Sequence, residues 1–103
     1  MDQLARIKYM EQILGEGAAA VAALEESLAA YRALQGCLQE LFDYYHSPLW
    51  MQDLDDDRAG KLPADLKRGV LSEDAVWELE TATHALVPML QDLLPKHQQL
   101  LHT

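Results

Sequence analysis

The stretch that decides the fold is residues 3–46, QLARIKYMEQILGEGAAAVAALEESLAAYRALQGCLQELFDYYH. Its apolar residues recur every three or four positions, which is the spacing of one helical face. They form two rows in near-heptad phase: Ile7, Leu14, Val21, Leu28 and Phe42, then Met10, Leu24, Tyr31, Leu38 and Tyr45. The rows are widened by Ile13, Leu34 and Leu41. This pattern predicts a long N-terminal helix over residues 3–46.

Two glycines raise the question of whether this helix is continuous. Gly15 and Gly17 each weaken a helix by about 1 kcal/mol relative to alanine, so they are candidates for a break. The seven-residue step from Leu14 to Val21 nevertheless continues across them, and we therefore favour one long helix, straight or bent. Gly17 lies in the second row, where a missing side chain permits close approach of another backbone. Gln35 interrupts the first row.

A second helix is expected over residues 72–102. Ser72 is a good N-cap, and the acidic residues after it suit the positive end of the helix dipole. Pro88 lacks the amide hydrogen that a helix interior needs, so we expect a kink or break there. The apolar side consists of Val76, Leu79, Thr83, Leu86, Leu90, Leu93 and Leu100. We expect this helix to fold back antiparallel on the long one, which gives an all-α helical hairpin or three-helix-like bundle.

The middle segment, residues 47–71, is expected to be an ordered connection that carries short helices. Ser47-Pro48 predicts an N-cap and first turn of a helix through about Asp53. Pro63 predicts a second short turn over residues 64–68, which Gly69 closes. Both tryptophans, Trp50 and Trp77, are expected in the core, and an exposed Trp50 would become the best anchor for a protein interface.

The middle segment resembles domain-of-unknown-function family 4298 of bacteria. The resemblance rests on Tyr44-Tyr45, Ser47, Trp50, Asp53, the acidic run after it, Gly60-Lys61-Leu62-Pro63, Asp65-Leu66 and, above all, residues 67–74, KRGVLSED. It extends over most of the chain. Membership implies a small, all-helical, bacterial and cytoplasmic protein, and it implies no established activity.

Composition narrows the classes of partner. The chain has 103 residues, the size of a single domain, with 17 acidic and 8 basic residues and a formal net charge of −9. This balance argues against nucleic acid and against anionic membranes as partners, because both attract basic surfaces. Cys37 is the single cysteine, and the first turns carry charges instead of an apolar signal segment. These features predict a cytoplasmic location.

The acidic cluster after Trp50 raises a metal-binding alternative. A calcium loop that starts at Asp55 would place Asp57 and Gly60 correctly, but Leu66 stands where a bidentate glutamate is needed. One approximate half of a di-iron motif is also present at residues 43–46. The alternative function is therefore a divalent-metal-binding regulator or a metal-assisted enzyme built on Asp43, His46, Asp53, Asp55 and Asp57.

No set of catalytic residues and no phosphate-binding loop stands out, so the sequence favours a non-catalytic protein without a cofactor. An acidic surface suits a basic protein partner, as in immunity proteins and inhibitors that neutralise a toxin or nuclease. The expected interface consists of Trp50, Asp53, Asp55, Asp56, Asp57, Lys61, Lys67 and Arg68. A structural homodimer, in which a second copy covers part of the long helix, is a further alternative.

Overall fold

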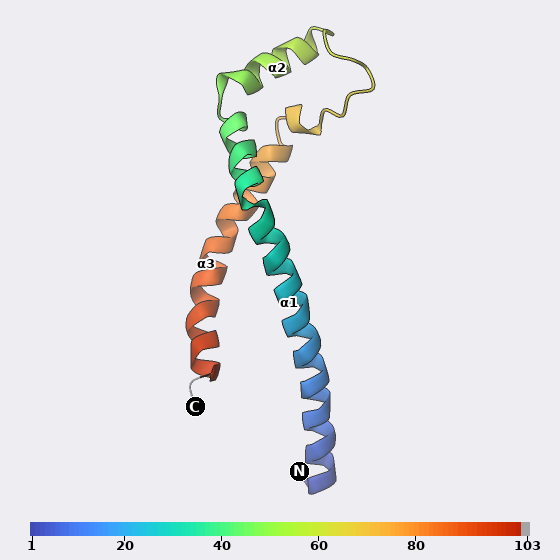
Figure 1. The fold of residues 1–103 in the computed structure, drawn as a ribbon, viewed down its shortest axis with the longest axis vertical. Coiled ribbons are helices and arrows are strands. Elements are labelled where there is room, and N and C mark those ends of the chain that lie inside the picture. Colours follow the sequence, from blue (N-terminus) through green and yellow to red (C-terminus); the bar gives the residue numbers. More distant parts are fainter. Residues whose placement is uncertain (102–103) are drawn as a thin grey trace. The chain divides into compact units, whose positions relative to one another are not determined.

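The computed structural model describes residues 1–101, and within them it contains α-helices, one 3-10 helix and no strand. The elements are α1 (Gln3–Tyr45), α2 (Pro48–Arg58), the 3-10 helix η1 (Gly69–Leu71) and α3 (Ala75–Leu101) (Figure 1). The prediction of an all-α fold is confirmed. A long N-terminal helix, an ordered connection with short helices and a C-terminal helix follow one another in the expected order.

The contacts divide the chain into two compact units, Met1–Leu38 and Gln39–Thr103. The boundary lies inside α1. The helix runs through Gly15 and Gly17 without interruption, so the favoured prediction of a single long helix is confirmed. No residue of α1 is buried, because the first unit is one helix and supplies no second element to pack on.

Helix α2 starts where the sequence predicts. Ser47 is its N-cap residue in an extended conformation, and Pro48 occupies the first helical position. The Ser47 hydroxyl donates to the Tyr44 carbonyl at 2.6 Å and so ties the turn to the end of α1. The helix continues to Arg58 instead of ending near Asp53 as predicted, because the acidic run is itself helical.

A glycine ends α2. Gly60 has a φ of +74°, the left-handed conformation that residues with a side chain adopt at a cost. Its amide donates to the Asp57 carbonyl, and the amide of Lys61 donates to the Asp56 carbonyl, each at 3.0 Å. These two bonds are the pattern of a Schellman motif, which satisfies carbonyls left open at a helix end.

The core of the second unit is small and lies where α1, α2 and η1 meet. Trp50, Leu54 and Leu71 form a buried cluster, against which Tyr44, Tyr45 and Leu62 pack. Trp50 is 8% exposed, which confirms its predicted place in the core.

The expectation that Trp77 is also a core residue is wrong, because its exposed fraction is 56%. Val76, its neighbour on α3, is buried at 3% exposure. Successive residues of an α-helix point about 100° apart, so burial of Val76 turns Trp77 towards solvent.

Helix α3 is capped by the residue that the sequence indicates. The Ala75 amide donates to the Ser72 hydroxyl oxygen at 3.1 Å. Pro88 and Pro95 both lie inside the helix, which continues to Leu101 without a break. None of the helices in residues 1–101 combines the length and the apolarity needed to cross a membrane.

Candidate binding surface

Arg68 organises the connection between α2 and η1. Its Nε donates to Oδ1 of Asp57 at 2.7 Å. Its Nη atoms donate to three backbone carbonyls of the preceding loop, those of Pro63 at 2.7 Å, Leu66 at 3.1 Å and Ala64 at 3.2 Å. The planar guanidinium can satisfy several acceptors at once, so one side chain holds the whole loop against α2. Asp57 and Arg68 therefore stabilise the fold through their contact with each other and with the loop.

Trp50 ties the other end of the connection to α2. Its indole Nε1 donates to the Val70 carbonyl at 2.8 Å, while its ring packs edge-on against Tyr45 with centroids 4.9 Å apart. A buried tryptophan needs a partner for its N–H group, and η1 supplies it. The expected use of Trp50 as an interface anchor required an exposed side chain, which the structure does not show.

A third internal contact involves the first residue of the acidic cluster. The Tyr44 hydroxyl donates to Oδ2 of Asp53 at 2.5 Å. Partial burial, followed by this hydrogen bond and the negative charge of Asp53, raises the pKa of Tyr44 to about 12. Each of these effects disfavours a phenolate, whose charge would be both desolvated and placed beside a carboxylate. Asp53 thus joins α2 to the last turn of α1.

The remaining predicted interface residues stay accessible to a partner. Asp55 is exposed on the last turns of α2, and Lys67 is exposed in the connection. Asp56 and Lys61 form an ion pair with 3.7 Å between Oδ1 and Nζ, and both side chains are substantially exposed. Such a pair contributes little to stability, about 0–1 kcal/mol, and can be exchanged for contacts with another molecule.

The metal-binding alternative finds no assembled site in the described chain. Asp55 and Asp57 lie on helix α2, not on the loop that a calcium site of the predicted kind needs. Nε2 of His46 instead contacts both carboxylate oxygens of Glu80, at 2.9 and 3.0 Å. Within residues 1–101, no group of three or more His, Cys, Asp or Glu side chains lies close enough together to hold a metal ion.

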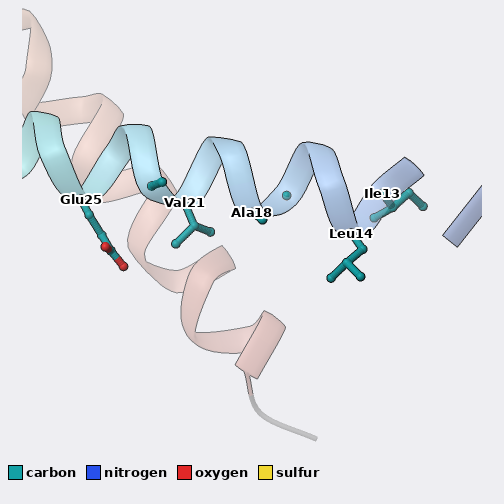
Figure 2. Close-up of a pocket in the computed structure, with 7 residues that line it drawn as sticks. Ile13, Leu14, Ala18, Val21 and Glu25 are labelled. Atoms are coloured by element: carbon teal, nitrogen blue, oxygen red, sulfur yellow. The ribbon is translucent and has the colours of Figure 1, made fainter. Parts of the chain in front are cut away.

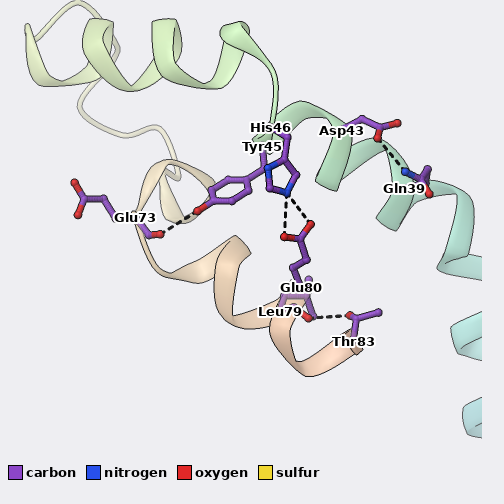
Figure 3. Close-up of polar contacts among 8 residues, drawn as sticks. All are labelled: Gln39, Asp43, Tyr45, His46, Glu73, Leu79, Glu80 and Thr83. Carbon is purple, nitrogen blue, oxygen red and sulfur yellow. Dashed lines mark hydrogen bonds and ion pairs between the residues drawn. The ribbon is translucent and has the colours of Figure 1, made fainter. Parts of the chain in front are cut away.

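Among residues 1–101, two side-chain contacts connect the end of α1 with α3 or with the turn just before it, and one of them is the contact between His46 and Glu80. The other is a hydrogen bond at 3.4 Å from the Tyr45 hydroxyl to the Glu73 carbonyl. Figure 3 shows both, with Tyr45 and His46 reaching from the end of α1 towards α3. The sequence pattern does not predict this pairing, because His46 and Glu80 are 34 positions apart and no motif connects them.

An exposed aromatic side chain lies beside these contacts. Trp77 is on the first turn of α3, which begins at Ala75, so Glu80 and Thr81 are the residues three or four positions away that share its helix face. Glu80 is acidic, and Glu73 and Asp74 add two more carboxylates in the turn just before the helix. Glu73 pairs with Arg58 at 2.7 Å and Glu80 contacts His46, whereas Asp74 is exposed. We call Asp74, Trp77 and the two glutamates the Trp77 patch.

The sequence does not predict this patch, because its apolar pattern favours a core position for Trp77. The available signal was the acidic sequence around Trp77, with Glu73 and Asp74 before it and Glu78 and Glu80 after it. A tryptophan whose helical neighbours are acidic combines a flat apolar surface with negative charge. That combination suits an arginine or lysine side chain of a partner.

Acidic charge is concentrated in the second unit. Residues 39–103 carry 12 acidic and 5 basic residues, whereas residues 1–38 carry 5 acidic and 3 basic residues. The formal charges are therefore −7 and −2, and together they give the −9 of the whole chain. The unit that holds the folded core and the Trp77 patch also holds most of the net charge.

Comparisons with known proteins identify a family without pointing to an activity. No curated protein and no solved structure gives a significant match to the chain. The sequence pattern of one family matches residues 7–100, and its description is domain of unknown function (DUF4298). This match covers all but the ends of the chain and agrees with the resemblance seen in residues 67–74. The chain therefore belongs to the DUF4298 family.

Proposed function

We propose that this protein is a non-catalytic binding protein of the bacterial cytoplasm, and that its second unit neutralises a basic protein partner in the manner of an immunity protein or inhibitor. The observation that carries the proposal is the exposed Trp77, in an acidic stretch of sequence within a unit that has a formal charge of −7. Exposed tryptophans are frequent anchors of protein interfaces, and acidic surroundings select a cationic counterpart.

The internal contacts narrow the interface that the sequence predicts. Asp53 and Asp57 are held by Tyr44 and Arg68, so their charges are partly compensated inside the unit. The accessible carboxylates of the acidic cluster are those of Asp55 and the loosely paired Asp56. We infer that the partner contacts the Trp77 patch first and that Asp55 and Asp56 add long-range attraction.

The test is affinity capture of the tagged protein from a lysate of its source cells at low salt, with mass spectrometry to identify what is retained. We expect the wild-type protein to retain a basic protein and the Trp77→Ala variant to lose it. Truncation of a central tryptophan typically costs an interface about 2 kcal/mol or more, roughly a thirtyfold loss of affinity. Retention of the same partner by Trp77→Ala would contradict the proposed anchor.

Two variants that each remove one negative charge distinguish binding through a specific surface from attraction by the net charge of the protein. Asp74→Asn removes one charge inside the Trp77 patch, and Asp92→Asn removes one charge further along the same helix, from a side chain that is 71% exposed. We expect Asp74→Asn to weaken capture and Asp92→Asn to leave it nearly unchanged. Equal losses in both would point to non-specific attraction by charge and would contradict a defined interface.

The acidic cluster is tested by a double change, Asp55→Asn with Asp56→Asn. Because these two side chains make no contact that holds the core, the variant is expected to keep its stability and to bind its partner more slowly. The association rate of electrostatically steered partners falls steeply with added salt, and this variant should show a shallower salt dependence than the wild type. An unchanged salt dependence would remove these residues from the interface.

A further inference from the structure

We propose that a second copy of this chain docks on the apolar stripe of the first unit, so that two α1 helices form a parallel, in-register coiled coil over residues 7–31. In coiled coils the positions of each seven-residue repeat are lettered a to g, and a and d form the seam. Ile7, Leu14, Val21 and Leu28 fall at a. The d positions are Met10, Gly17, Leu24 and Tyr31.

The length of α1 leaves this stripe without a complete cover inside one chain. Helix α1 has 43 residues and α3 has 27, and α3 begins beside the end of α1, where His46 contacts Glu80. Both helices rise about 1.5 Å per residue. Even if α3 followed α1 along its whole length, about 16 residues at the start of α1 would remain beyond its reach. Ile7, Met10 and Leu14 belong to that remainder, and each is at least 50% exposed.

The charges that flank the stripe favour a second copy in parallel orientation. In a parallel pair, position g of one helix faces position e of the next repeat on the other, and opposite charges there stabilise the pairing. Arg6 is at g and Glu11 is at the facing e, so each dimer has two such pairs. The later e residues, Glu25 and Arg32, face Ala20 and Ser27, so no like charges oppose each other.

Neither member of this pair is engaged elsewhere. Within residues 1–101, the ion pairs involve neither Arg6 nor Glu11. An antiparallel pair would instead align the e positions of the two helices with each other. With its axis near residue 18, that arrangement places Glu11 opposite Glu25, which is unfavourable.

The surface of the stripe carries a hollow at Gly17, which lies at a position where a coiled coil normally receives a side chain of the partner. A shallow, largely apolar depression is lined by Leu14, Gly17, Ala18 and Val21, together with Ile13, Ala22 and Glu25 (Figure 2). In a parallel coiled coil, residues at a, d, e and the next a form the hole that receives a d side chain of the partner. In register, that d residue is the partner's Gly17, which has no side chain, so the hole stays empty.

The empty hole can be tested with two substitutions. Gly17→Leu fills it, whereas Gly15→Leu adds the same side chain at a position away from it. A Cβ atom built on Gly17 meets nothing within 4 Å in a single chain, and the same holds for Gly15 on the outer position b. Gly17→Leu and Gly15→Leu therefore bring the same gain in helix propensity and in apolar surface. Only Gly17→Leu places the new side chains in the seam.

The measurement is sedimentation equilibrium of the full chain from about 1 µM to about 1 mM. We expect wild-type protein to dimerise, Gly17→Leu to lower the dimer dissociation constant about tenfold or more, and Gly15→Leu to change it less than about threefold. A wild type that stays monomeric at the highest concentration, an assembly larger than a dimer, or equal effects of the two leucine variants would overturn the proposal.

Charge reversal tests the register. Arg6→Glu and Glu11→Arg should each weaken the dimer about threefold to tenfold, and the double variant should restore it. Lys8→Glu is the control, because it makes the same change of charge at the outer position b. If the double variant is no tighter than the single variants, or if Lys8→Glu weakens the dimer as much, the parallel register is wrong.

Orientation is read directly by cross-linking. In a Cys37→Ser background, Ile7→Cys places a thiol at the first a position of each helix. Two such thiols meet in a parallel pair and form a disulfide under mild oxidation, whereas in an antiparallel pair they lie at opposite ends. A dimer that forms without this disulfide would overturn the parallel arrangement.

Discussion

The guanidinium of Arg68 and the carboxylate of Asp57 meet at 2.7 Å between Nε and Oδ1, and this contact fixes the connection to the helix that precedes it. The same guanidinium also binds three carbonyls of the loop. The connection is therefore ordered by one cation that satisfies four acceptors, with little apolar burial of its own.

Arg68→Ala should open this connection. We expect a loss of about 2 kcal/mol in the free energy of unfolding, since charge-assisted hydrogen bonds are removed and loop carbonyls lose their donor. Limited proteolysis should then cut between residues 60 and 68 faster than in the wild type. Lys67→Ala is the control, because Lys67 is exposed. Equal protease sensitivity in the two variants would show that Arg68 does not hold the loop.

Trp50→Phe should destabilise the second unit by about 1–2 kcal/mol, because the part-buried hydrogen bond from the indole to the Val70 carbonyl is lost while most of the apolar contact is kept. Trp77→Phe, at an exposed position, should change stability by less than about 0.5 kcal/mol. Urea unfolding of both variants measures the difference. Tryptophan emission adds a check, because Trp50 in the Trp77→Phe variant should resist quenching by acrylamide.

Tyr44 should titrate later than an ordinary tyrosine. Its pKa is raised to about 12, whereas a tyrosine in an unfolded chain ionises near 10. Between these values the unfolded state releases a proton that the folded state keeps, so the stability from this group is complete below about pH 10 and is lost as pH rises towards about 12. Phenolate absorbance should therefore show a late step.

The Tyr44→Phe variant is the control for this titration. It should lack the late step and should lose less stability than the wild type over the same alkaline range. It should also be less stable near neutral pH, because Asp53 loses a hydrogen bond. If the late step survives in Tyr44→Phe, it belongs to another group.

Gly60→Ala should destabilise the end of α2 by about 1 kcal/mol, because a residue with a Cβ atom is strained at a φ of +74°. Nothing lies within 4 Å of the added atom, so the effect is one of backbone conformation and not of crowding. Gly36→Ala, in the middle of α1, should instead raise helix content. Thermal unfolding followed by circular dichroism distinguishes the two, and a stabilising Gly60→Ala would show that the left-handed turn is not required.

The features that could be predicted from sequence are those encoded by residues close together in the chain. The phase of the apolar rows gives α1 as one helix across its glycines, Ser47-Pro48 gives the start of α2, and Ser72 gives the cap of α3. Each depends on local geometry that the residue type determines. The core position of Trp50 can also be predicted, because a tryptophan on a short helix close to Tyr44 and Tyr45 can bury its ring against them.

The candidate surface was harder to predict because it depends on which side chains meet across the connection. The pairing of Asp57 with Arg68 and the contact of His46 with Glu80 join different elements, and the spacing of residues does not reveal either. These contacts change the role that we assign to the acidic cluster, because Asp53 and Asp57 stabilise the fold. Trp77 is exposed to solvent, whereas the sequence predicts that it lies in the core.

The span of the contacts in the second unit has a consequence for how the chain acquires its structure. Among residues 1–101, the side-chain hydrogen bonds that join different elements connect residues between 9 and 34 positions apart. Most other contacts of the described helices join neighbouring turns of one helix, so the contact order is low, and such chains fold on a timescale of about microseconds to milliseconds. All of these contacts lie between residues 44 and 80, so a ribosome that has released this segment has released everything that the small core requires.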